Sequence, residues 1–318
     1  MTLPMKRRPA PPRRARGFTL VEAVVTIAIL GIVAGIVAVF IRAPVLSYRD
    51  TVDRAELTDQ ADLALRRIAR DIRLALPNSV RVSDAGDHLE LLLTRSGARY
   101  LSAEDGVTSV PVLSFDSPGS NTFTAIGMPA SFAQVKAGDY IVVYNLGPGF
   151  EPANAYDLAA TGVSACPSSS SAAAAGNIAC INAAPAGATT TINGQGIPTT
   201  TITLAGNPFA YQQAPLTSPE QRFQVVSGPV SFYCAQNTDG RLALWRAWDY
   251  PIAKDQAVPT GGKRALVATG LTTCSDVFGY GTAARRTGLV RIALSLRGRT
   301  EAPPTIRLVH QVHVDNTP

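Results

Sequence analysis

Glu22 is the only ionisable side chain in an apolar run of 24 residues from Phe18 to Ile41, FTLVEAVVTIAILGIVAGIVAVFI. A carboxylate at the boundary of a hydrocarbon layer is costly unless it is paired. The run contains no Lys, Arg or His, so the partner of this acid must come from elsewhere. We therefore expect Glu22 to be a functional group that pairs with a positive charge outside its own segment.

The remaining residues that could do chemistry do not form a catalytic set. His310 and His313 are three apart in a strand-like run, which points them to opposite faces rather than at one metal. The pair Gly279-x-Gly281 lacks the third glycine of a dinucleotide loop, and the sequence has no P-loop or nucleophile elbow. The sequence therefore predicts a protein that is not an enzyme, with no cofactor and no metal site.

The four cysteines are not arranged in C-x-x-C spacing, which favours two structural disulfides in an oxidising periplasm over a zinc site. The sequence alone permits three connectivities. We favour Cys166–Cys180 and Cys234–Cys274, because the first pair closes a loop of about 15 residues, worth about 3 kcal/mol in the chain-entropy model.

The net charge of +6 belongs to the first 17 residues, which hold six of the 29 basic residues and no acid, and the rest of the chain balances at 23 against 23. The six are Lys6, Arg7, Arg8, Arg13, Arg14 and Arg16. A helix of 24 residues rises about 36 Å, enough to cross a layer of about 30 Å. The positive-inside rule then places residues 1–17 in the cytoplasm and the 277 residues after Ile41 outside the inner membrane.

Three ordinary targeting segments fit this N-terminus less well. A secretory signal peptide has a shorter apolar run followed by a small-x-small cleavage site. The pair Arg13-Arg14 suggests a twin-arginine signal, but an acid inside the apolar segment is wrong for one. A simple signal anchor fits the length and leaves Glu22 unexplained.

Residues 42–76 have the pattern of an amphipathic helix that continues into the head. We expect Pro44 to bend this helix and Pro77 to stop it. Its arginines are expected on a solvated face, with a basic stripe facing acidic patches of neighbouring subunits as the alternative; they are Arg66, Arg67, Arg70 and Arg73. Asp59, Asp62 and Asp71 are interleaved with them, so no single-signed field for nucleic acid results, and we expect no nucleic-acid partner.

Residues 77–318 show short alternating runs separated by turn residues, the pattern of antiparallel strands. The expected strands are His88–Thr94, Asp139–Asn145, Arg222–Ser227, Val230–Cys234, Leu242–Trp248, Leu289–Leu296 and Ile306–Val314. One long helix followed by a sheet predicts an α+β fold. Residues 151–215 are rich in Ala, Ser, Thr, Gly and Pro, and we expect a surface insertion that orders poorly and has little to bury.

Charge is unevenly divided within the head. Residues 101–220 carry about −6 and residues 221–318 about +6. Either chance together with intramolecular attraction, or head-to-head complementarity between subunits, would account for this division.

The residues RGFTLVE, Arg16 to Glu22, followed by an apolar helix resemble the class III signal of type IV pilins and type II secretion pseudopilins. The resemblance implies that prepilin peptidase cuts between Gly17 and Phe18 and N-methylates Phe18. It also implies that Glu22 pairs with the Phe18 ammonium of a neighbouring subunit in a filament. By analogy with that family, a subunit that caps the tip often lacks this acid, so the present chain is not expected to be the cap.

A second likeness covers residues 48–57 and 64–81, which resemble the MshO-type minor pilins of mannose-sensitive haemagglutinin pilus systems, and residues 310–315 are similar to the end of that family. The likeness implies a minor pilin whose partners are prepilin peptidase, major and minor pilins, the inner-membrane assembly platform and the lipid bilayer. The alternative is a J-type minor pseudopilin of type II secretion, whose helix end also resembles an Arg-Asp-x-Arg-x-Ala-Leu run. A different class, a signal-anchored periplasmic adhesive or binding module, also stays open.

Overall fold

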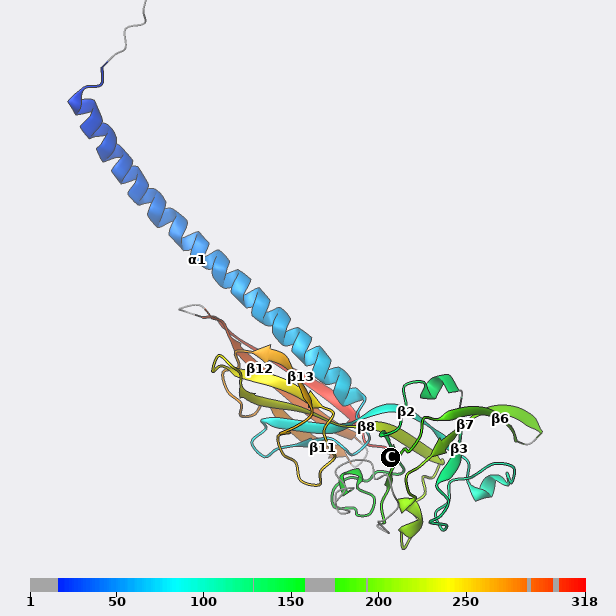
Figure 1. Cartoon of the computed structure of the whole chain (residues 1–318). Helices are drawn as coiled ribbons and strands as arrows, with labels where there is room; N and C mark the ends of the chain where they lie inside the picture. The colour runs from blue at the N-terminus through cyan, green and yellow to red at the C-terminus, as the bar shows by residue number, and fades with distance from the viewer. Residues whose placement is uncertain (1–16, 128, 158–174, 193, 285–286, 300–302) are drawn as a thin grey trace, which may run out of the picture. The chain divides into compact units, whose positions relative to one another are not determined.

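The computed structural model describes residues 17–318 apart from 128, 158–174, 193, 285–286 and 300–302. The chain divides into two compact units, residues 1–53 and residues 54–318. Helix α1 (Leu20–Arg73, 54 residues) contributes to both units (Figure 1). The helix continues through Pro44, and it ends three residues before the expected Leu76.

The second half of α1 is held by one apolar face. Its buried side chains recur at helical spacing and are Leu57, Ala61, Ala64, Leu65, Ile68, Ala69 and Ile72. Beyond Arg73 the chain joins the sheet directly, because the Leu76 N–H donates to the Leu92 carbonyl (2.8 Å) and the Thr94 N–H donates to the Leu74 carbonyl (2.9 Å). These backbone bonds, rather than Pro77, end the helix.

The larger sheet of the head contains ten strands, with β10-β9-β8-β2-β3-β7-β6 as its main path. Strand β1 pairs with β2, and β4 pairs with β5 and β8. Every pairing in this sheet is antiparallel. The strands are β1 Arg81–Val82, β2 His88–Tyr100, β3 Thr122–Ile126, β4 Tyr140–Val142, β5 Ile178–Cys180, β6 Ala186–Ile192, β7 Gln195–Thr203, β8 Arg222–Gln236, β9 Leu242–Trp248 and β10 Lys263–Thr269.

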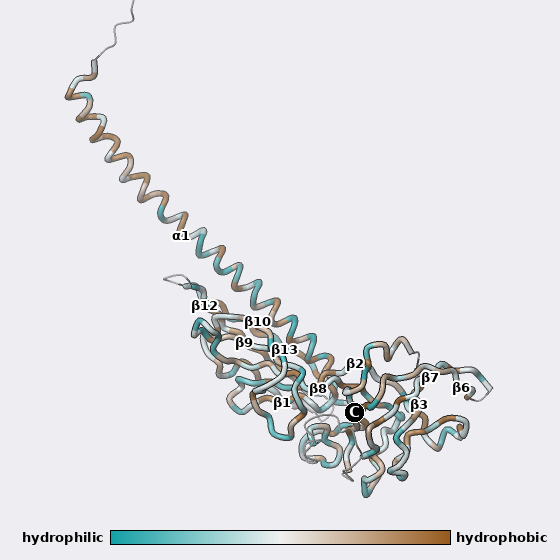
Figure 2. Tube along the Cα trace, viewed as in Figure 1, coloured by the Kyte–Doolittle hydropathy of each residue, from teal (hydrophilic) through white to brown (hydrophobic). Residues whose placement is uncertain are grey.

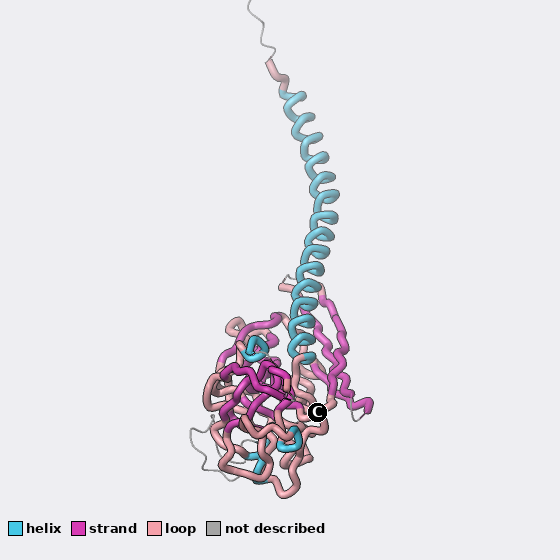
Figure 3. Tube along the Cα trace, turned by 90° about the vertical axis from the view of Figure 1, so that its right-hand side faces the viewer, coloured by secondary structure: helices cyan, strands magenta, loops and turns pink. Residues whose placement is uncertain are grey.

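A smaller antiparallel sheet follows in the order β11-β12-β13. Its strands are β11 Phe278–Ala284, β12 Thr287–Arg297 and β13 Thr305–Asp315. One face of β12 is fully buried through Val290, Ile292, Leu294 and Leu296, as the alternation predicted. These side chains share a core with residues 57–72 of α1 and with one face of the larger sheet, so the head is built around this half of the helix (Figure 3). The predicted α+β fold is confirmed.

The structure corrects two expectations about the head. Arg222–Ser227 and Val230–Cys234 are one strand, β8, in which Gly228 (φ 114°) and Pro229 accompany an irregular register rather than a turn. The stretch 151–215 was wrongly expected to have little to bury. Its described part forms β5, β6 and β7, and it buries side chains that are at most 3% exposed: Ile178, Ile181, Ile202, Leu204 and Phe209.

Candidate functional site: the start of the helix and the polar sites of the head

Thr19 caps the start of α1. Its hydroxyl oxygen accepts the Glu22 N–H at 3.3 Å, and its carbonyl accepts the Ala23 N–H at 3.1 Å. The helix therefore begins at Leu20 and places Glu22 in the first turn, where the helix dipole favours a negative charge. Gly17 and Phe18 precede the helix, and Phe18 is 71% exposed.

The first half of α1 presents apolar side chains on all sides. From Leu20 to Ile41 the large aliphatic and aromatic residues are between 46% and 81% exposed. The most apolar 18-residue window has a mean hydropathy of 3.0, and none of it is buried. Figure 2 shows this half as a nearly unbroken hydrophobic tube, in contrast to the mixed second half. Such a surface needs lipid or other helices to cover it, and its length suffices to cross a membrane.

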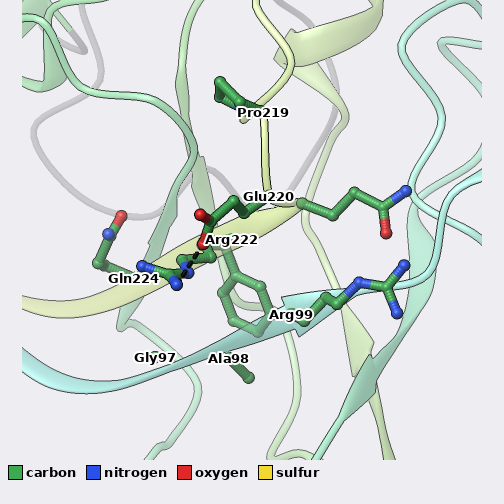
Figure 4. Close-up of a pocket in the computed structure, with 9 residues that line it drawn as sticks. Gly97, Ala98, Arg99, Pro219, Glu220, Arg222 and Gln224 are labelled. Atoms are coloured by element: carbon green, nitrogen blue, oxygen red, sulfur yellow. Dashed lines mark ion pairs between the residues drawn. The ribbon is translucent and has the colours of Figure 1, made fainter. Parts of the chain in front are cut away.

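A hollow of about 720 Å³ lies on the strands β2 and β8, over residues 97–99 and 219–224. Figure 4 shows its charged side chains, of which Glu220 and Arg222 form an ion pair with each other. Arg99 pairs with Asp105 outside the hollow. Its lining contains no His, Cys or Asp, so it offers neither a nucleophile–base pair nor a set of metal ligands.

A buried polar cluster lies on the opposite face of β2 from α1. The His88 Nε2 lies 2.9 Å from the Ser231 hydroxyl, which is 2.5 Å from the Tyr250 hydroxyl, and Arg81 donates twice to one oxygen of Glu90 (3.2 and 3.0 Å). Burial lowers the pKa of His88 to about 4. Burial also raises the pKa of Glu90, although the charge and hydrogen bond of Arg81 act to lower it.

This cluster holds a loop onto the sheet. Arg81 also donates to the carbonyls of Ala253 and Lys254 (2.9 and 2.6 Å), which belong to the loop after β9. Ser231 is 0% exposed, so its hydroxyl is closed to any substrate. Sequence reasoning missed the cluster, although the alternation in His-Leu-Glu at the start of β2 places His88 and Glu90 on one face.

Residues 12–38 match the family described as "Prokaryotic N-terminal methylation motif". This match falls on the basic segment, the predicted cleavage site and the exposed apolar helix, and a β-sheet head follows. The chain is a type IV pilin-like protein. No curated protein and no solved structure is similar enough to the chain to count as a match.

The motif indicates the general role of the pilin-like protein. It is a structural subunit rather than an enzyme, it is processed by prepilin peptidase, and its partners are those of a pilus or pseudopilus system. The signal together with the apolar helix implies anchoring in the inner membrane.

The cysteines of the pilin-like protein follow the expectation as far as the described residues reach. Cys234 and Cys274 form a disulfide that closes 40 residues and links β8 to the loop before β11. Cys180 is also disulfide-bonded, whereas Cys166 lies outside the described residues. The pairing Cys166–Cys180 therefore stays a prediction.

Four of the seven acids in residues 101–220 form ion pairs inside the molecule. Asp105 and Asp139 pair with Arg99 and Arg95, which lie outside both stretches, and Asp157 pairs with Lys254 of residues 221–318. The fourth pair, Glu220–Arg222, spans the boundary between the two stretches. Two ion pairs thus join the two stretches, and intramolecular attraction accounts for part of the division.

The arginines of α1 mostly face solvent, as expected. Arg66, Arg70 and Arg73 are exposed, and Arg66 pairs with Asp62 one turn earlier. Asp71 faces the other way and pairs with Arg246 of β9 at 2.7 Å inside the head.

Proposed function

We propose that the pilin-like protein is a minor pilin of an MSHA-like type IV pilus, cleaved between Gly17 and Phe18 and N-methylated on Phe18. The observation that carries the proposal is an acid in the first turn of an exposed apolar helix, four residues after the expected new N-terminus. The likeness of residues 48–57, 64–81 and 310–315 to MshO-type subunits supports the choice of system.

Cleavage would supply the charge that the helix lacks. A free amine at Phe18 is positive at neutral pH, and Glu22 is negative. Buried opposite charges are tolerable in an apolar layer only when they meet. Glu22 is exposed in the first turn of α1, so its carboxylate is available to the ammonium of an adjacent subunit.

The proposed division of the chain follows from this reaction. Residues 1–17 are a leader on the cytoplasmic side, residues 18–41 span the inner membrane, and the head from residue 77 lies in the periplasm. The partners are prepilin peptidase, the major and minor pilins, the inner-membrane assembly platform and the bilayer. The mature subunit joins or primes a filament, and its retained acid makes it a subunit other than the tip cap.

Substitution of Glu22 tests the pairing. We expect Glu22→Gln to be cleaved normally and to be recruited to co-produced pilins at least tenfold less than the parent, because an unpaired ammonium remains in the apolar layer. Glu22→Asp keeps the charge, and Glu56→Gln removes an exposed acid of the same helix as a matched control. Recruitment of Glu22→Gln at the parent level contradicts the pairing.

A second candidate is the J-type minor pseudopilin of a type II secretion system, favoured by the run Arg70-Asp71-Ile72-Arg73-Leu74-Ala75-Leu76. Co-purification of the processed chain from cells lacking either the pilus platform or the secretion platform separates the two. Loss of its subunit partners only without the secretion platform would replace the pilus assignment. Full function after exchange of residues 18–41 for an unrelated anchor would instead favour an adhesive or binding module.

A further inference from the structure

Strand β13 has one paired edge and one open edge. It pairs with β12 over eleven residues, from Thr305↔Arg297 to Asp315↔Thr287, without a shift in register. Within the described part of the chain no strand pairs with its other edge. An edge of this length presents a row of unpaired N–H and C=O groups and is a template for a strand of another chain.

One hydrogen bond shows which backbone N–H and C=O groups of β13 face its open edge. The Gly298 N–H donates to the Pro304 carbonyl at 3.0 Å, in the same register as the pairs of β12 and β13. Hydrogen-bonded pairs recur at every second residue of an antiparallel ladder. The even-numbered residues of β13 therefore bond to β12, and the odd-numbered residues, including Arg307, Val309 and Gln311, direct their backbone groups to the open edge.

Two other sheet edges carry features that discourage pairing. Strand β10 begins with Lys263 and Arg264 and has a register shift between Leu266 and Ala268. At the start of β11 the Phe278 N–H donates to the Gly86 carbonyl at 2.8 Å, which closes that end. Strand β13 has no proline, lysine or bulge, and Val309 in its middle is 54% exposed.

The exposed face beside this edge is basic. The odd-numbered residues of β12 and β13 include Arg291, Arg297 and Arg307 against one acid, Asp315. An added strand would lay alternate side chains along this face, next to Val309. An acidic segment with an apolar residue at its centre complements this face best.

A second copy of β13 fits the edge poorly. The Asn78 N–H just after α1 donates to the Asn316 side-chain oxygen just after β13 (3.2 Å), and Figure 1 shows β13 running along the last turns of α1 in the same direction. Antiparallel pairing of two β13 strands would therefore run helices 54–73 of the two copies in opposite directions. Subunits side by side in one membrane leave it in the same direction.

We propose that the open edge of β13 receives an extended acidic segment of a different, neighbouring pilin-like subunit, which adds a fourth strand to the smaller sheet. The inference rests on the proposed function in one respect, that the partner belongs to the same assembly. Backbone pairing to the odd-numbered residues supplies affinity, and the arginines select the acidic segment.

A proline substitution tests the edge directly. Val309→Pro removes an N–H of the open edge and leaves the bonds to β12 intact, and edge strands tolerate such a proline. Val309→Thr keeps the N–H and the branched shape. Thr189→Pro is the control, because it makes the same change on another edge strand, β6. The Gly127 N–H donates to the Pro198 carbonyl at 3.2 Å, which shows that the even-numbered residues of β7 bond to β3 and its odd-numbered residues to β6. In the register of β6 with β7 the Thr189 N–H then faces the open edge.

The full chain and each variant are produced in the native cells together with the other pilin-like subunits, solubilised in detergent and co-purified. We expect Val309→Pro to retain at least tenfold less of these subunits, and Val309→Thr and Thr189→Pro to stay within twofold of the parent. Parent-level retention by Val309→Pro overturns the proposal. Loss of residues 1–17 in all four chains shows that processing is intact, so an uncleaved chain reports failure of the proposed function instead.

Two further readouts, which need no proline in β13, test the proposal if Val309→Pro does not fold. In the co-purified complex, the odd-numbered amides of β13 should exchange hydrogen at least tenfold more slowly than in the chain alone. Benzoylphenylalanine at position 309 should cross-link to an acidic segment of another subunit. Unchanged exchange, or a cross-link to β13 of a second copy, overturns the proposal.

Discussion

The ion pair between Asp71 and Arg246 fixes the second half of α1 to strand β9, and its removal gives the sharpest stability prediction. The Arg246 Nε lies 2.7 Å from the Asp71 Oδ2, and the two side chains are only 12% and 2% exposed. Removing one partner of a buried pair costs about 3–5 kcal/mol when the other charge is left without compensation. Asp71 keeps one weaker contact, at 3.5 Å from the largely exposed Arg70, so the low end of this range applies. We expect Arg246→Met to lower the free energy of unfolding of the head by about 3 kcal/mol.

The chain contains a control with the same geometry and a different environment. The Arg66 Nε also lies 2.7 Å from the Asp62 Oδ2, but these side chains are 77% and 46% exposed. Exposed pairs of this spacing contribute about 0.5 kcal/mol or less. Arg66→Met should therefore change the unfolding free energy almost undetectably, which separates burial from distance as the source of the effect.

Urea unfolding of the full chain in detergent measures both variants. The two tryptophans, Trp245 and Trp248, lie on β9 beside the pair and report unfolding of the head by fluorescence. The double variant Arg246→Met with Asp71→Leu should recover to within about 1 kcal/mol of the parent, because apolar residues can replace a buried pair. Equal costs for Arg246→Met and Arg66→Met would refute the reasoning.

Two further predictions concern the head. Burial lowers the pKa of His88 from 6.5 to about 4. As the pH drops from about 6.5 to about 4, the unfolded chain is therefore protonated at His88 before the folded chain, and the free energy of unfolding falls. At 1.36 kcal/mol per pKa unit the loss is about 3 kcal/mol. Urea titrations at several pH values should show this loss in the parent and lack it in His88→Gln, and identical pH profiles would contradict it. Replacing Cys234 and Cys274 by Ala releases a loop of 40 residues and should cost about 4 kcal/mol in the chain-entropy model. Reduction of the parent opens this disulfide and also that of Cys180, so its cost in urea unfolding should equal or exceed that of the double variant. A cost below about 1 kcal/mol in both experiments would contradict the prediction.

The parts of the fold that local pattern determines were predictable. The continuous apolar run and the amphipathic spacing after it predicted α1 to within three residues at its end. Short alternating runs bounded by turn residues predicted β9, β12 and β13. The chemistry of the N-terminus was also local, because Gly17, Phe18 and Glu22 lie within six residues.

The strands that depend on their neighbours were not predictable from pattern. Strands β6 and β7 are rich in Thr and small residues, and they are stabilised by cross-strand contacts such as the Thr190 hydroxyl 2.9 Å from that of Thr199. Gly228-Pro229 has the sequence of a turn, yet pairing with β2 carries β8 straight through it. The His88 cluster likewise exists only because Arg81, Ser231 and Tyr250 converge from distant positions.

The central claim is that this pilin-like protein is processed at Gly17 and assembles through the new N-terminus. Mass spectrometry of the N-terminal peptide, from cells with and without prepilin peptidase, tests it most directly. We expect a methylated Phe18 N-terminus with residues 1–17 removed in the first case and the uncleaved chain in the second. A chain that still carries residues 1–17 in peptidase-positive cells would contradict the account.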